Sequence, residues 1–79
     1  MLKIYINEDL SAWKRYTITK GDVLYQLIVQ KESFVLKKVG AVGLNFVPSG
    51  VLVRKPAKKF VIIVQNKIKD HENINSQSK

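Results

Sequence analysis

The sequence predicts an α+β fold in which two short helices lie between strands, with a further strand at each end of the domain. Three observations lead to this fold class. Apolar and more polar residues alternate in Leu2–Ile6, as they do in a half-buried strand. A Gly21-Asp22 step separates a strand-like segment from one with helical spacing. Near the C-terminus, Phe60–Val64 is the most apolar run of the chain.

Length and composition limit the class of protein. A chain of 79 residues, 46% hydrophobic and 25% charged, fits a single globular domain. The absence of cysteine excludes disulfides and thiolate metal sites, and one histidine, His71, cannot form a metal cage alone. We therefore expect no metal and no cofactor. The apolar runs are too short for a membrane span, and residues 1–9 lack the long apolar stretch of a secretion signal.

The N-terminal half predicts two strands followed by two helices. Residues 2–6 form the first strand, residues 7–11 a polar turn, and residues 13–19 a strand rich in β-branched and aromatic residues. Gly21 suits a tight turn, and Asp22 is placed to cap a helix that begins at Val23. Ser33 is placed to cap a second short helix that runs through residue 39, and Gly40 then provides a left-handed stop.

The C-terminal half predicts a turn, two more strands and a tail. Residues 45–50 contain a Val-Pro step and a Ser-Gly pair, which favour a turn, and residues 51–53 form a short strand closed by Pro56. Phe60–Val64 predicts a strand. From Asp70 onward the chain is polar and predicts a disordered tail. We therefore expect one domain over residues 1–69 and a tail over residues 70–79.

Catalysis is not expected from these residues. The few acids within the predicted domain are not neighbours of His71 in the sequence, and His71 lies in the predicted tail, where nothing orients it. The sequence has no nucleophile elbow, phosphate-binding loop or dinucleotide fingerprint. We therefore expect a protein that is not an enzyme.

One segment resembles the opening of a LysM module: residues 16–27, Tyr-Thr-Ile-Thr-Lys-Gly-Asp-Val-Leu-Tyr-Gln-Leu. Residues 47–56 resemble the closing turn, strand and proline of the same family. The resemblance covers residues 16–56 and implies a βααβ core module with residues 2–6 and 60–64 as extra flanking strands. The asparagine that follows the second helix in carbohydrate-binding members has no clear counterpart here.

The Pro48-Ser49-Gly50 turn is similar to that of small phage tail proteins of the tail-protein-X type, which are LysM-like. This resemblance implies a non-catalytic structural component of a phage tail or tail-like particle, in the baseplate, hub or tube region. It also implies other tail proteins as partners and assembly in the bacterial cytoplasm. The predicted partner-binding residues are the apolar run with the two lysines before it: Lys58, Lys59, Phe60, Val61, Ile62, Ile63 and Val64.

Two alternatives stay open. The first is a LysM module that binds N-acetylglucosamine in peptidoglycan or chitin, through the two loops of the module: Gly21, Asp22, Val23, Asn45, Phe46, Pro48, Ser49 and Gly50. The second is a small basic nucleic-acid-binding protein, because the net charge is +8 and much of the basic excess lies in the C-terminal third. The separation of aromatic from basic residues in the sequence argues against nucleic acid as the partner.

Overall fold

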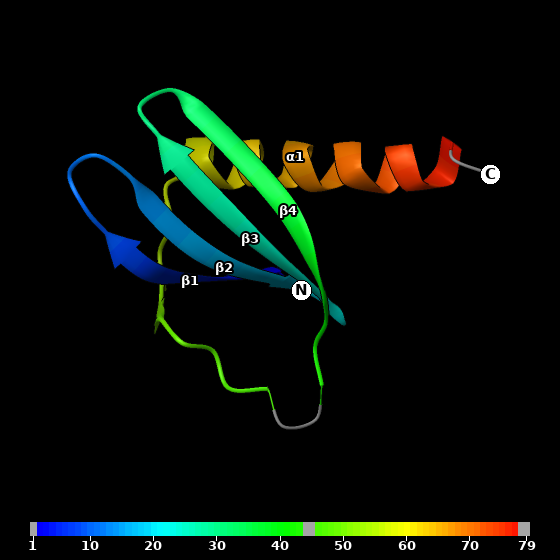
Figure 1. Ribbon diagram of the computed structural model, residues 1–79, viewed down its shortest axis with the longest axis horizontal. Helices are drawn as coiled ribbons and strands as arrows, with labels where there is room; N and C mark the ends of the chain where they lie inside the picture. Colours follow the sequence, from blue (N-terminus) through cyan, green and yellow to red (C-terminus); the bar gives the residue numbers. More distant parts are fainter. Residues whose placement is uncertain (1, 44–45, 78–79) are drawn as a thin grey trace.

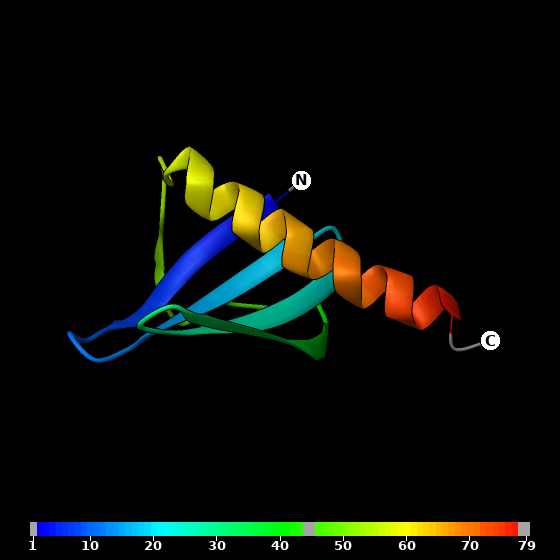
Figure 2. The same cartoon turned by 90° about the horizontal axis from the view of Figure 1, so that it is seen from above.

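The computed structural model describes residues 2–43 and 46–77 and shows an antiparallel sheet covered on one face by one helix (Figures 1 and 2). The strands are β1 (Leu2–Asp9), β2 (Lys14–Lys20), β3 (Val23–Gln30), β4 (Ser33–Ala41) and β5 (Val51–Leu52). The sheet order is β4-β3-β2-β1-β5, so β5 returns to the outer edge of β1. The helix is α1 (Lys58–Gln77).

The predicted βααβ module is wrong. Both segments expected to be helices are strands, β3 and β4, and they pair with each other in a hairpin. Asp22 is therefore not a helix cap but part of the two-residue turn between β2 and β3, where Gly21 takes a φ of 60°. A two-residue turn joins neighbouring antiparallel strands directly, and glycine accepts the positive φ that such turns require. Gly40 lies inside β4 rather than at a helix end.

The C-terminal prediction is also corrected. Phe60–Val64, expected to be a strand, forms the first turns of α1, and the segment from Asp70 to Gln77, expected to be a disordered tail, continues that helix. The reason is visible in the spacing of the buried residues. Val64 and Ile68 are buried in the core, and Phe60 and Val61 pack against it, so these positions share one helical face.

The hydrophobic core lies between α1 and one face of the sheet. Successive side chains of a strand point to opposite faces, so Ile4, Ile18 and Leu27 share the face that α1 covers. Val64 and Ile68 meet them from the helix, and both are almost fully buried. Burial of side chains of this size contributes about 1.5–3 kcal/mol each, which makes this contact the main stabilising element of the small domain.

A bulge in β1 holds the connection between β4 and β5 in place. The pairing of β1 with β2 shifts between Ile6 and Glu8, which leaves Asn7 as the extra residue. Its Oδ1 accepts a hydrogen bond from Thr17 Oγ1 (2.7 Å), and its Nδ2 donates to Ser49 Oγ (2.9 Å) and to the Ser49 carbonyl (3.2 Å). The next residue, Gly50, packs directly on the backbone of Ile6. The Asn7 side chain and the close packing of Gly50 on Ile6 thus hold the connection against β1.

Replacement of Gly50 by alanine is expected to destabilise the fold. A Cβ at this position would lie 2.5 Å from the Ile6 carbonyl oxygen, so the backbone must shift. We expect Gly50→Ala to lower the free energy of unfolding by about 1–3 kcal/mol, as overpacking does elsewhere. Denaturant unfolding followed by circular dichroism measures this loss.

The matched control is Gly40→Ala, where a new Cβ has no neighbour within 4 Å. This control is expected to leave stability unchanged or to raise it slightly, because alanine restricts the unfolded chain. Equal losses in the two variants would contradict the proposed close approach at Gly50.

Candidate functional site

The net positive charge of this protein comes from one part of the chain. Residues 33–69 contain eight Lys and Arg residues and no acid, whereas the remaining residues contain six basic and six acidic side chains. The whole net charge of +8 therefore comes from residues 33–69. In the fold, this segment comprises β4, the connection to β5, β5 itself and the first three turns of α1.

The ion pairs of the structure do not neutralise this segment. Among the side chains described, in residues 2–43 and 46–73, three salt bridges form: Asp9 with Lys14 (3.0 Å), Glu8 with Arg15 (2.8 Å) and Glu72 with Lys20 (2.9 Å). Each takes its cation from outside residues 33–69. Ion pairs among the described side chains therefore leave the cations of residues 33–69 without a neutralising acid.

The outward side of α1 gathers cations and amides. Val61, Val64 and Ile68 face the sheet, so the opposite side of the helix is exposed along its first three turns (Figure 2). We call this surface the α1 outer face. Its members are the exposed residues of these turns: Lys58, Lys59, Ile62, Gln65, Asn66 and Lys69. None of them is acidic, and only Ile62, which is 55% exposed, is apolar.

Contacts along the helix fix the direction of the α1 outer face. At the N-terminal end, the Phe60 ring lies 4.9 Å from the Tyr16 ring of β2. Toward the C-terminal end, His71 Nε2 is hydrogen-bonded to the Leu36 carbonyl of β4 (2.7 Å), and its ring meets the edge of Tyr25 at 6.0 Å. Rotation of α1 about its own axis would break these contacts, so they hold the α1 outer face in one orientation.

Two phenols beneath the helix have perturbed acidity. Burial raises the pKa of Tyr25 above its ordinary value of 10.0, and the nearby carboxylate of Glu72 raises it further, while Lys20 opposes the shift. Burial also raises the pKa of Tyr16. Both groups therefore stay neutral in the folded protein at physiological pH, and they serve packing rather than proton transfer.

The structure divides the predicted partner-binding residues between core and surface. Lys58, Lys59 and Ile62 belong to the α1 outer face. Phe60, Val61 and Val64 instead pack toward the sheet, and Ile63 is half-buried. The expected two-sided apolar strand is thus an amphipathic helix whose apolar side is covered internally.

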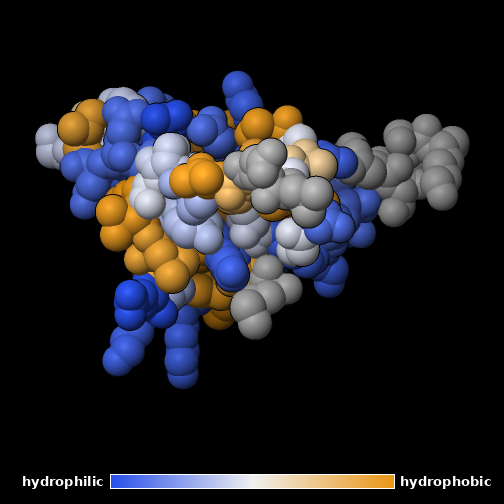
Figure 3. Space-filling model, turned by 90° about the horizontal axis from the view of Figure 1, so that it is seen from below, coloured by the Kyte–Doolittle hydropathy of each residue, from blue (hydrophilic) through white to orange (hydrophobic). Residues whose placement is uncertain are grey.

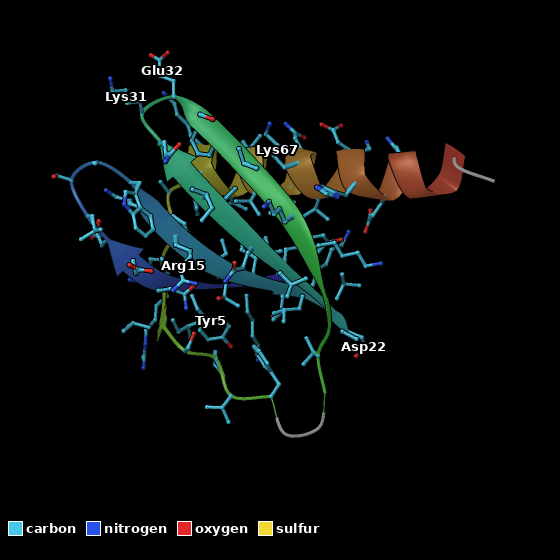
Figure 4. The ribbon with its side chains drawn as sticks, in the orientation of Figure 1. Tyr5, Arg15, Asp22, Lys31, Glu32 and Lys67 are labelled. Carbon is cyan, nitrogen blue, oxygen red and sulfur yellow. The ribbon has the colours of Figure 1, made fainter. Side chains whose placement is uncertain are left out.

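The structure places the described members of the predicted glycan site in two separate groups. Gly21, Asp22 and Val23 lie at the β2–β3 turn, at the right-hand end of the sheet in Figure 4, where Asp22 is labelled. Pro48, Ser49 and Gly50 lie near Ile6 and Asn7. Leu2 pairs with Lys20 beside the turn, so the two groups are separated by four residues of β1, about 13 Å. Phe46 is half-buried, and Asn45 lies outside the described residues.

The α1 outer face is not evident in the sequence when Phe60–Val64 is taken as a strand. A helical interpretation was available in the spacing of Val61, Val64 and Ile68, which recur at intervals of three and four. With that period, Gln65, Asn66 and the flanking lysines fall on the opposite side. The signal was weak because five consecutive apolar residues hide the periodicity.

Side chains that could hold a metal ion are not gathered in the part of the chain that the structure describes. Residues 2–43 and 46–73 contain no group of three His, Asp or Glu side chains that could hold a metal ion. Over residues 2–43 and 46–77, no helix is long and apolar enough to cross a membrane. Comparison with protein-family models, curated proteins and solved structures finds no match for this chain.

Stability is expected to fall at alkaline pH because of Tyr25. Its pKa is raised in the folded state, so its contribution is complete below about pH 10 and is lost as the pH rises through the folded-state pKa. Tyr25→Phe removes this ionisation. The free energy of unfolding of Tyr25→Phe should therefore decrease less between about pH 8 and about pH 11 than that of the unaltered protein.

Denaturant titrations at both pH values measure this difference, and Tyr5→Phe provides the control. Tyr5 is half-exposed on the sheet face away from α1, so Tyr5→Phe controls for the loss of a phenol hydroxyl outside the core. If the two variants lose stability equally, burial of Tyr25 is not the cause.

Proposed function

We propose that this protein is a non-catalytic binding module whose α1 outer face contacts double-stranded nucleic acid. The observation that supports this function is the composition of the face: cations and amides, without an acid in the first three turns of the helix. Lysines neutralise phosphates, and this electrostatic contribution dominates affinity for nucleic acid. Glutamine and asparagine pair with adenine edges through two hydrogen bonds in the major groove.

The dimensions of the α1 outer face fit this partner. The helical rise between Lys58 and Lys69 is about 16 Å, and an α-helix with its side chains is about 10–12 Å wide. The major groove of B-DNA is about 12 Å wide and accepts such a helix. Gln65 and Asn66 lie between the lysines along the helix, so amides face the base edges while cations at both ends reach the phosphates of the groove walls.

The start of α1 adds a second electrostatic argument. Helices favour acidic side chains in the first turn, because the N-terminal N–H groups carry partial positive charge. Here the first turn has no acid and contains Lys58 and Lys59, and the preceding connection contributes Arg54 and Lys55. Repulsion among these like charges lowers the stability of the unbound protein. A bound phosphate relieves it, since the anion interacts with the lysines and with the helix end together.

Protein partners suit the α1 outer face less well. Stable protein interfaces have an apolar centre, whereas this face exposes a single large apolar residue, Ile62. The expected role in a phage tail and the expected glycan site both depended on a βααβ module. The two loops of that module are apart in the sheet, which argues against a glycan site built from both loops; the role in a phage tail stays a prediction.

Neutralisation of two lysines on the α1 outer face is expected to weaken binding to a short fluorescent duplex. For Lys58→Gln with Lys59→Gln, the slope of log affinity against log salt concentration should become shallower by about 2, because each phosphate contact contributes about 0.9. Fluorescence anisotropy over a series of salt concentrations measures the slope and the affinity.

The matched control is Lys31→Gln with Lys37→Gln, which removes the same charge elsewhere. Lys31 is in the turn between β3 and β4 (Figure 4), and Lys37 lies on the sheet face away from α1. The control should keep most of the salt dependence. Equal effects of the two double variants, or failure of the unaltered protein to bind duplex at low salt, would refute the proposed interface.

A further inference from the structure

A hollow of about 570 Å³ lies between the start of β1 and α1, and we call it the β1–α1 hollow. Its polar lining comes from three elements: Lys3 from β1, Arg54 from the segment between β5 and α1, and Gln65 from α1. The rest of its lining is apolar and includes Leu2, Leu52, Val53 and Val61. Seen from below, an apolar area of the surface is bordered by long hydrophilic side chains (Figure 3).

The backbone places two cations side by side at this hollow. Where β5 ends, the Val53 amide still donates to the Ile4 carbonyl (2.9 Å), in the register of β1 with β5. The next residues in this register are Lys3 and Arg54, and both are exposed. Like charges opposite one another on neighbouring strands are unfavourable. Neither residue takes part in a salt bridge among the described side chains, so an anion between them would remove this repulsion.

The adjoining hollow along α1 suits an anion less well. It continues from Gln65 toward the C-terminal end of the helix and reaches Glu72. The Glu72 carboxylate would repel an anion, and it already forms a salt bridge with Lys20 (2.9 Å). Among the described residues, no acidic side chain lines the β1–α1 hollow. The anion is therefore expected beside the first turns of α1.

We infer that the β1–α1 hollow holds one sugar–phosphate strand of a DNA duplex whose major groove contains the α1 outer face. This inference rests on the proposed function. A helix in the major groove lies between two phosphate backbones. Gln65 belongs both to the α1 outer face and to the wall of the hollow, so a backbone beside the helix passes over the hollow. Lys3 and Arg54 then bind phosphates of that strand.

The lining of the hollow favours this occupant over others. Bases taken out of a stack are bound on aromatic rings, and no aromatic residue of the described chain lines the hollow. An uncharged aliphatic ligand would leave both cations unpaired. A DNA strand provides phosphates for the cations and the carbon edges of its deoxyribose rings for the apolar floor. Such contacts with phosphate and sugar position a protein on the duplex.

A carboxylate placed in the hollow tests the inference, with the full chain and a short fluorescent DNA duplex. Leu52 lines the hollow and is 43% exposed, so Leu52→Asp should fold, which circular dichroism checks. Fluorescence anisotropy should show an affinity at least about tenfold lower, because the new charge repels the phosphates. The matched control is Val39→Asp, since Val39 is 55% exposed and lies on β4 at the opposite edge of the sheet. This control changes the net charge equally and should alter affinity less than about twofold.

Removal of the two cations measures the phosphate contacts directly. For Lys3→Gln with Arg54→Gln, the slope of log affinity against log salt concentration should become shallower by about 2. Lys31→Gln with Lys37→Gln again serves as the control and should keep most of the slope.

Equal affinities of Leu52→Asp and Val39→Asp overturn the inference, and so does an unchanged slope after removal of the two cations. If Lys58→Gln with Lys59→Gln still makes the slope shallower in that case, the α1 outer face binds DNA and the hollow is left for a different anionic partner, such as an acidic peptide. Failure of the unaltered protein to bind the duplex refutes the proposed function itself, and the inference with it.

Discussion

A single helix covers the apolar face of a five-stranded sheet, and every other feature of the protein depends on this contact. Val64 and Ile68 enter a surface formed by Ile4, Ile18 and Leu27. A chain of this size buries only about 60% of the surface that its unfolded form exposes, so the loss of one covering element would expose most of the core. The same contact determines which helical residues are left facing solvent.

Specific polar contacts add to this packing and fix the positions of segments that apolar packing alone would leave free to shift. His71 connects α1 to the edge strand β4, and Asn7 connects β1 to the turn before β5. Both side chains pair with backbone carbonyls or a hydroxyl, and each joins segments that are more than thirty residues apart in the chain. They determine where the helix and the crossing connection lie relative to the sheet.

Charge is distributed unevenly over the surface. Cations gather on the side of α1 that faces away from the sheet, and Arg54 and Lys55 lie in the segment that leads from β5 to α1. Where the end of β1 meets the start of β2, Glu8 and Asp9 form ion pairs with Arg15 and Lys14. The positive potential is therefore greatest near α1 and its preceding connection, where a polyanion would be attracted.

Local patterns in the sequence were sufficient for the strands at Leu2–Ile6 and residues 13–19, the Gly21 turn and the short strand at Val51, since alternation and turn chemistry act within a few residues. They misled at Val23–Gln30 because apolar residues occur on both faces of β3: Val23, Tyr25, Leu27 and Val29 face α1, whereas Leu24 and Ile28 lie on the opposite face. They misled again at Phe60–Val64, whose conformation depends on what the segment covers. The α1 outer face could be located only after the sheet had selected the buried side of the helix, because burial against distant strands decides between a helix and a strand when local preference is balanced.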